Sequence, residues 1–213
     1  MNTNALERVD ACGILPVIAV PSVEAAVPLA DALVRGGVNA IEVTLRKSWA
    51  LEALARIRAA HPDMAIGAGT VLRKDQVAVA KEAGADFIVA PGLDADIVST
   101  AQAAELPIVP GVSDPTQITA AYKMGLRTLK FFPSELFGGV AALTLYHGPF
   151  PDVKFVPTGG LTMDNIGAYL AKPFVSACGG SFMAKSDVIR AGNWDSIEAN
   201  CRKCIAIAKE ARS

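Results

Sequence analysis

Three stretches of the chain share one pattern and decide the fold: GGVNAIEV at residues 36–43, AGADFIVA at 83–90 and MGLRTLKF at 124–131. In each, a helical pattern ends at a glycine, which can adopt the left-handed conformation that closes a helix. A short apolar run typical of a buried strand follows within a few residues. Repetition of this helix-to-strand phrase indicates a parallel α/β architecture, in which strands and helices alternate along the chain.

The same alternation extends from these stretches to both ends of the chain. Apolar runs predict eight strands, at residues 14–20, 40–45, 65–68, 87–90, 107–109, 128–131, 154–156 and 174–178, with helical patterns between and after them. This count predicts an α/β protein that forms a single closed (β/α)8 barrel, a TIM barrel, over residues 1–213. The alternative is an open doubly wound sheet, but the first strand lacks the glycine-rich turn that usually accompanies that fold.

Composition and charge limit the possible classes of function. The 213 residues are 52% hydrophobic, enough for one domain with a large core. The 20 basic and 21 acidic residues show no basic block, so we expect no nucleic-acid partner. No apolar run approaches the ~18 residues of a membrane span, and residues 1–12 carry charge without an apolar signal core. We therefore expect a cytoplasmic protein with no membrane partner.

The cysteines and histidines form no pattern typical of a metal site. Cys201 and Cys204 have the spacing of half a zinc or redox site, but they lie in a helical pattern without a second ligand pair. His61 and His147 are remote from them in sequence. We interpret the cysteine pair as part of a packed helix face, and we expect neither a metal nor a cofactor.

Lys130 is the leading candidate for catalysis, because it falls inside a predicted buried strand. Side chains alternate along a strand, so Lys130 shares one face with Thr128 and Phe132. An ammonium group in a folded core is costly and is rarely kept without a purpose. Removal from water favours the neutral amine, which can attack a carbonyl carbon and form a Schiff base. The alternative is a strand-end lysine that extends into solvent.

Polar side chains also gather where the second predicted strand ends. Alternation places Glu42, Thr44 and Arg46 on one face and apolar residues on the other. Active sites of barrels lie at the carboxyl ends of the strands, so this face should meet Lys130. The alternative is an ion pair in which Glu42 and Arg46 only satisfy each other.

Glycines and prolines follow several other predicted strands. The pairs at 159–160 and 179–180 follow the seventh and eighth strands, where barrels commonly hold a phosphate on bare N–H groups. The string GAGT at 67–70 either lets a ligand approach the backbone or forms a tight turn. Pro91 and Pro110 either start rigid loops or form an apolar wall. The paired glycines favour an anionic small molecule as the ligand.

The residues resemble a known family, the 2-keto-3-deoxy-6-phosphogluconate (KDPG) aldolases, which also includes 4-hydroxy-2-oxoglutarate aldolase activity. The resemblance is carried, in order, by IEVTLR at 41–46, GAGTVL at 67–72, KFFP at 130–133, PTGG at 157–160 and GGS at 179–181. It implies a class I aldolase, a lyase that needs no metal, usually a homotrimer. Its substrate would be a phosphorylated keto acid, cleaved to pyruvate and glyceraldehyde 3-phosphate in the Entner–Doudoroff pathway.

The resemblance also implies a role for each site residue. Lys130 would form the Schiff base, and Glu42 would be the general acid and base. Substrate-binding roles fall on Arg46 and Thr70 at the pyruvate carboxylate, Pro91 and Phe132 at an apolar wall, Thr158 facing the substrate, and Gly159, Gly160, Gly180 and Ser181 at the phosphate. Arg46 favours this branch, because the related 6-phosphogalactonate aldolases tend to carry Asn at that place.

Two alternatives of other classes stay open. An isomerase or epimerase of sugar phosphates would share the glycine pairs but would need no buried lysine. The second is a non-catalytic protein that binds phosphorylated metabolites. Such a protein would not need Glu42, Arg46 and Lys130 to lie together.

Overall fold

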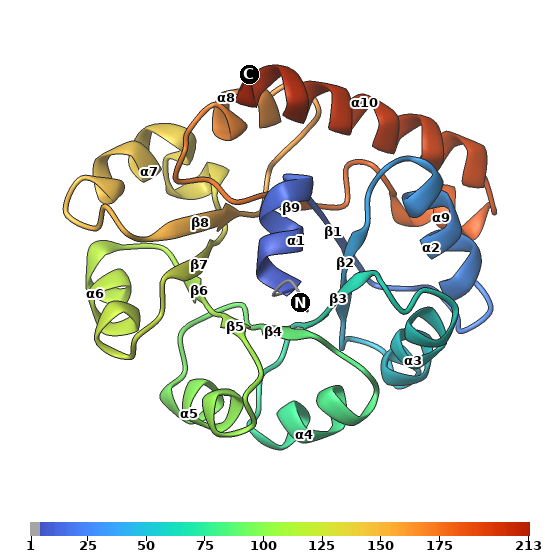
Figure 1. The fold of residues 1–213 in the computed structure, drawn as a ribbon, viewed down its shortest axis with the longest axis horizontal. Helices are drawn as coiled ribbons and strands as arrows, with labels where there is room; N and C mark the ends of the chain where they lie inside the picture. Colours follow the sequence, from blue (N-terminus) through green and yellow to red (C-terminus); the bar gives the residue numbers. More distant parts are fainter. Residues whose placement is uncertain (1–4) are drawn as a thin grey trace.

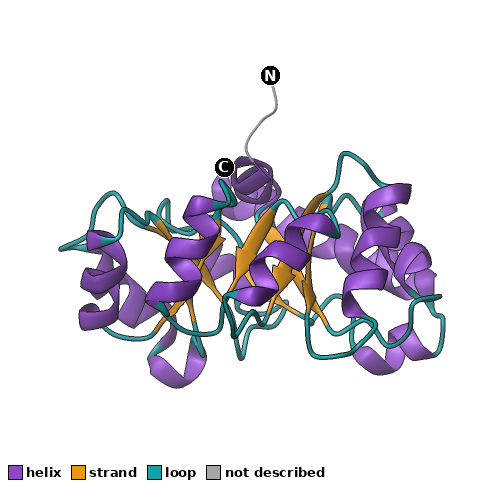
Figure 2. Cartoon of the chain, turned by 90° about the horizontal axis from the view of Figure 1, so that it is seen from below, coloured by secondary structure: helices purple, strands orange, loops and turns teal. Residues whose placement is uncertain are grey.

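The computed structural model describes residues 5–213, and residues 1–4 of the predicted domain lie outside it. Helices and strands alternate along this part of the chain, as the repeated phrase predicts (Figure 1). In side view the strands are enclosed by helices (Figure 2). No helix within residues 5–213 is long and apolar enough to cross a membrane.

The strands form two parallel sheets. Six strands pair in the order β5-β4-β3-β2-β1-β9, and three pair in the order β6-β7-β8. Their bounds are β1 (Ile14–Ile18), β2 (Ala40–Thr44), β3 (Ala65–Gly69), β4 (Phe87–Val89), β5 (Ile108–Val109), β6 (Gly111–Val112), β7 (Thr128–Phe131), β8 (Lys154–Pro157) and β9 (Cys178–Gly180). Because the pairing is parallel, the carboxyl ends of the strands in each sheet lie at one edge.

The prediction of a closed eight-stranded TIM barrel is wrong, because the hydrogen-bonded ladder is interrupted in two places. The first interruption divides the predicted fifth strand. Val109 pairs with β4, whereas Gly111 pairs with β7, so the chain passes from one sheet to the other at Pro110. Proline has no N–H with which to continue a ladder. Its carbonyl accepts a hydrogen bond from the Lys130 N–H instead.

The second interruption lies between β8 and β9. The strand predicted at 174–178 begins only at Cys178, where it pairs with β1. A turn precedes it, in which the Val175 N–H donates to the Lys172 carbonyl. Within residues 5–213, this region is joined to β8 by isolated bridges at Val175 and Gly179 alone. The architecture is therefore a six-stranded half-barrel with a separate three-stranded sheet.

Helices lie around the outside of both sheets (Figure 1). They are α2 (Ala26–Arg35), α3 (Ala50–Ala60), α4 (Asp75–Glu82), α5 (Ala95–Ala103), α6 (Pro115–Lys123), the 3-10 helix η1 (Glu135–Phe137), α7 (Gly139–His147), α8 (Ile166–Leu170), α9 (Ser186–Arg190) and α10 (Trp194–Arg212). Side-chain caps begin several of them. Asp94 accepts a hydrogen bond from the Ile97 N–H at the start of α5, as is common for aspartate at this position.

The first helix, α1 (Ala5–Cys12), lies against the interior rather than on the outside (Figure 1). Its Ala5 and Val9 are buried in a cluster with Phe87, Val89 and Val156, which come from both sheets. This cluster is separate from the larger core that includes the outer helices. α1 therefore closes the interior at the amino-terminal ends of the strands.

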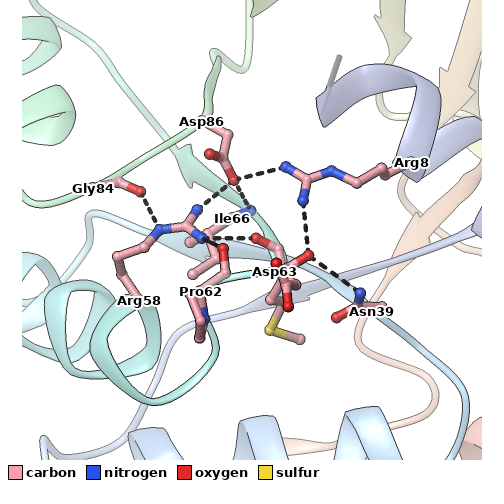
Figure 3. A network of polar contacts seen from close by, with 9 residues as sticks. Arg8, Asn39, Arg58, Pro62, Asp63, Ile66, Gly84 and Asp86 are labelled. Atoms are coloured by element: carbon pink, nitrogen blue, oxygen red, sulfur yellow. Dashed lines mark hydrogen bonds and ion pairs between the residues drawn. The ribbon is translucent and has the colours of Figure 1, made fainter. Parts of the chain in front are cut away.

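Arg8 holds α1 in this position through the network of Figure 3. Its guanidinium donates to the Asp63 carbonyl at 2.7 Å and lies 3.6 Å from the Asp86 carboxylate. Asp86 also accepts hydrogen bonds from Arg58 and from the Ile66 N–H. One carboxylate thus joins α1, α3 and the start of β3.

Replacement of Asp86 by alanine is expected to destabilise the fold, because two guanidinium groups and one N–H lose their shared acceptor. The pairs are partly exposed, so we expect a loss of about 2 kcal/mol of unfolding free energy. This corresponds to a fall in Tm of roughly 4–8 °C, measured by thermal unfolding. Asp75→Ala, which removes an exposed ion pair with Arg73, is the control and should cost about 0.5 kcal/mol or less. Equal melting of the two variants would contradict this role of Asp86.

The prediction of a packed helix face at the cysteine pair is confirmed. Cys201 and Cys204 are free, buried thiols of α10, and burial raises the pKa of Cys201 to about 12 and that of Cys204 to about 11. Across the described part of the chain, no group of three or more His, Cys, Asp or Glu side chains is placed to hold a metal ion.

Candidate active site

Lys130 lies in β7 with its amine inside the molecule. Its Nζ is 3.4 Å from each carboxylate oxygen of Glu42, which comes from β2 and is 88 residues away in the sequence. The two side chains belong to different sheets. They are only 8% and 1% exposed, respectively. The lysine does not extend into solvent, so the interpretation as a strand-end lysine is wrong.

Neighbouring glycine leaves room for the Glu42 carboxylate. On β3, the strand next to β2, a Cβ added to Gly69 would overlap the Glu42 side chain. Gly69 pairs with Thr44, two residues beyond Glu42 on the same face of β2. The sequence alone predicts a ligand approach or a tight turn for the glycines at 67–70. The structure shows a further use, because Gly69 leaves space for the buried Glu42 side chain.

Arg46 lies just beyond β2 and does not pair with Glu42. Its Nε donates to the Thr70 hydroxyl at 3.4 Å, whereas the Glu42 carboxylate pairs with Lys130. The alternative of an ion pair between Glu42 and Arg46 is therefore wrong. Arg46 is exposed, and its guanidinium can still bind an anion in two parallel hydrogen bonds.

A cavity of about 360 Å³ opens beyond the carboxyl ends of β1, β2, β8 and β9. Two of its lining residues are charged, Arg46 and Lys185, and both are cationic. The predicted site residues that line it are Arg46, Thr158, Gly159, Gly160, Gly180 and Ser181. Among the residues that the structure describes, the cavity lining therefore carries positive charge and no carboxylate.

Backbone N–H groups at this cavity add to its capacity for anions. Gly159 and Gly160 have φ angles of 97° and 81°, a left-handed conformation that glycine adopts at little cost. Within residues 5–213, no turn or loop hydrogen bond uses the backbone N–H of Gly160 or Ser181 as donor. Free N–H groups in such turns bind phosphate without help from a cationic side chain.

Lys130 and Glu42 lie between this open cavity and a closed space beneath it. The closed space has a volume of about 10 Å³, the size of about one water molecule, and is lined by both residues and by Val9 of α1. Val17, which lines the open cavity, pairs directly with Glu42 in the sheet. α1 thus closes the side of the pair that faces away from the open cavity.

Besides Lys130 and Glu42, which line the closed space, three predicted substrate-binding residues lie outside the lining of the open cavity. Thr70 contacts Arg46, as described above. The centre of the Phe132 ring is 5.4 Å from Lys130 Nζ, so this ring flanks the amine. The Pro91 carbonyl packs against Gly111, the β6 residue that pairs with Lys130. Pro91 is therefore near the strand of the lysine, but the structure does not bring it to the cavity.

Phe182 and Lys185 are among the lining residues that the sequence patterns do not predict. Both follow the glycine pair at 179–180. Their position after the end of a strand is the only feature of the sequence that could have indicated a place at the cavity. Thr44, which the alternation along β2 does predict, lines the cavity, while its hydroxyl donates to the Ile18 carbonyl at 3.3 Å.

The α/β fold and this site define the class of the protein. A buried lysine beside a carboxylate and next to a cavity for anions is what a class I aldolase requires to form a Schiff base with a keto acid. The comparison with known proteins identifies the particular family.

Residues 6–200 match the aldolase family described as KDPG and KHG aldolase. The chain is 42% identical to the 2-dehydro-3-deoxy-phosphogluconate aldolase of Haemophilus influenzae over 204 residues, 96% of each chain. It is also 42% identical to the KHG/KDPG aldolase of Escherichia coli K12 over 196 residues, 92% of each chain. The KDPG aldolase of Legionella pneumophila, whose structure holds pyruvate as a covalent carbinolamine intermediate, superposes with a TM-score of 0.90 at 37% identity, covering 95% of this chain and 98% of that one. The chain therefore belongs to the KDPG and KHG aldolase family.

Proposed function

We propose that this aldolase cleaves KDPG to pyruvate and glyceraldehyde 3-phosphate through a Schiff base on Lys130. It also cleaves 4-hydroxy-2-oxoglutarate, which is 2-keto-4-hydroxyglutarate or KHG, to pyruvate and glyoxylate. This is the KHG activity in the name of the Escherichia coli relative. The observation that carries the proposal is the buried Lys130 amine, 3.4 Å from both oxygens of Glu42. The carbinolamine in the Legionella relative is the adduct that precedes such a Schiff base.

The reaction begins at C2, the keto carbon of the substrate. The Lys130 ammonium first transfers a proton to Glu42, and the resulting amine adds to this carbon and gives a carbinolamine. Glu42 donates a proton to the departing hydroxyl, directly or through one water, and loss of water leaves the protonated Schiff base. The position of both Glu42 oxygens at 3.4 Å from Nζ suits this transfer.

The protonated Schiff base then accepts the electrons of the breaking bond. Glu42, now a base, removes the proton of the C4 hydroxyl, the C3–C4 bond breaks and the aldehyde leaves. The electron pair remains on pyruvate as an enamine. Glu42 returns the proton to C3, and addition of water releases pyruvate and restores the free amine.

The remaining site residues bind the two ends of the substrate. Arg46 and Thr70 bind the carboxylate of the pyruvate half, and the Phe132 ring, beside Nζ, forms an apolar wall. Pro91 supports this wall from behind, through its contact with Gly111 beside Lys130. Thr158 faces the substrate. The phosphate lies at the open cavity, on Gly159, Gly160, Gly180 and Ser181.

The phosphorylated substrate should be preferred, because its phosphate gains charge-assisted hydrogen bonds at the cavity. We expect kcat/KM for KDPG to exceed that for 4-hydroxy-2-oxoglutarate by roughly tenfold or more. Release of pyruvate, followed through lactate dehydrogenase and NADH, measures both. If neither substrate releases pyruvate, the proposed function is wrong. Borohydride inactivation in the presence of pyruvate separates an aldolase from a sugar-phosphate isomerase.

We propose further that the chain is one domain, functions in the cytoplasm and assembles as a homotrimer. Free cysteines suit a reducing compartment. Exposed apolar side chains suit an interface between subunits, and Leu136, Phe137 and Leu145 are 85%, 47% and 75% exposed along η1 and α7. Sedimentation of the full chain, against the 22.1 kDa mass of one copy, measures the assembly.

A further inference from the structure

A buried tyrosine near the cavity has no place in the reaction described above. Tyr169 of α8 is 1% exposed, and its hydroxyl contacts two side chains of the segment that follows β7. Its Oη lies 2.9 Å from Oγ of the fully buried Ser134 and donates a hydrogen bond to the Glu135 carboxylate. Neither Tyr169 nor Glu135 lines the open cavity.

The segment that Tyr169 contacts is bonded to the loop that carries the first glycine pair. The Ser134 N–H donates to the Thr158 carbonyl at 2.8 Å, and the Glu135 N–H donates to the Gly159 carbonyl at 3.1 Å. The Glu135 side chain lies directly against Gly160, where an added Cβ would overlap it. Through Glu135, the tyrosine hydroxyl is therefore connected to both glycines.

The same segment continues the strand of the reactive lysine. Ser134 comes four residues after Lys130, and Phe132, which flanks the amine, lies between them. One hydroxyl is thus bonded to the segment that joins the strand of the Lys130 amine to the Gly159–Gly160 loop. A substrate bound at both the lysine and this loop must match the distance between them, whereas a shorter substrate without a phosphate need not.

The protonation state of the tyrosine supports a donor role. Burial, followed by the hydrogen bond to Glu135, raises the pKa of Tyr169. The hydroxyl therefore keeps its proton at neutral pH and remains a donor to the carboxylate.

We propose that Tyr169 is a positioning residue that selects phosphorylated substrates, by fixing the Gly159–Gly160 loop relative to Lys130 through Glu135. The proposal rests on the function proposed above and deepens it. It names the side chains that position the phosphate-binding loop relative to the lysine that forms the Schiff base. It assigns them no contact with the substrate.

Tyr169→Phe tests the proposal, because it removes the hydroxyl and leaves the ring. We expect kcat/KM for KDPG to fall roughly tenfold, mainly through a higher KM, while kcat/KM for 4-hydroxy-2-oxoglutarate changes less than about twofold. Glu135→Ala should give the same selective loss. Glu135→Gln should retain most of the wild-type preference, because its amide oxygen can still accept the tyrosine proton.

Tyr122→Phe is the matched control, since it removes a tyrosine hydroxyl that bonds Asp152 on an exposed surface. It should leave both rates unchanged. An equal loss on both substrates in Tyr169→Phe and Glu135→Ala, or no loss on either, overturns the proposal. Borohydride trapping of pyruvate on each protein distinguishes a failure of the proposed aldolase function from a failure of the role proposed for Tyr169. Its absence in the wild type contradicts the aldolase itself, whereas trapping with unselective kinetics contradicts only the role of Tyr169.

Discussion

Replacement of Lys130 by alanine is expected to abolish cleavage of KDPG, with kcat/KM reduced by roughly 10³-fold or more, because the variant has no amine beside Glu42. Borohydride with pyruvate should add the mass of reduced pyruvate to Lys130 of the wild type and nothing to the variant. Mass spectrometry of the digested protein measures both the mass and its position.

A second variant separates loss of the nucleophile from loss of the fold. Alanine leaves the buried Glu42 carboxylate without a partner, which costs about 3–5 kcal/mol where one member of a buried pair is removed. Lys130→Arg keeps the positive charge but forms no imine, so it should fold and stay inactive. Lys154→Ala removes an exposed amine that pairs with Asp10 and should keep full activity. A pyruvate adduct on Lys130→Arg would place the Schiff base on another residue.

Glu42→Gln should separate the two halves of the reaction. The amide fills the same space beside Gly69 but transfers no proton, so we expect turnover of KDPG to fall by roughly 10²- to 10⁴-fold. Borohydride trapping of pyruvate should persist, because Lys130 is intact and can still add to the keto carbon. Stopped turnover with continued trapping is the combination to be measured.

The control for Glu42→Gln is Glu52→Gln, on the exposed face of α3. It removes one carboxylate without touching the interior, and its turnover should equal that of the wild type. Full activity of Glu42→Gln would remove Glu42 from the mechanism. Loss of trapping along with turnover would instead assign Glu42 to formation of the adduct.

The alternation of side chains is what makes the centre of the site predictable. Period two along β2 and β7 places Glu42 and Lys130 on inward faces, and both are buried there. The partner of Glu42 is not predictable in the same way. Arg46 is four residues away and Lys130 is 88, yet the lysine is the partner. Such a pairing depends on how two sheets pack, which no local pattern contains.

The number of strands likewise does not determine how they pair. The apolar runs predict the alternation of strands and helices, but the ladder depends on single N–H groups, and Pro110 lacks one.

The sequence does not predict the role proposed for Tyr169 for a different reason. In the sequence Tyr169 is an ordinary apolar residue of a short helix, and its contact with Glu135 depends on the position of the segment between β7 and α7. Only the tertiary structure brings the two residues together.

The first strand of the chain pairs with the last, since β1 lies beside β9 in the six-stranded sheet. A ribosome must therefore have made the chain as far as β9 before this sheet can be completed, and contacts so distant in sequence form slowly. Until then, the nascent chain lacks the enclosure that keeps the lysine and its carboxylate together. Enzymatic turnover thus reports a finished molecule, and incomplete synthesis products should contribute none of it.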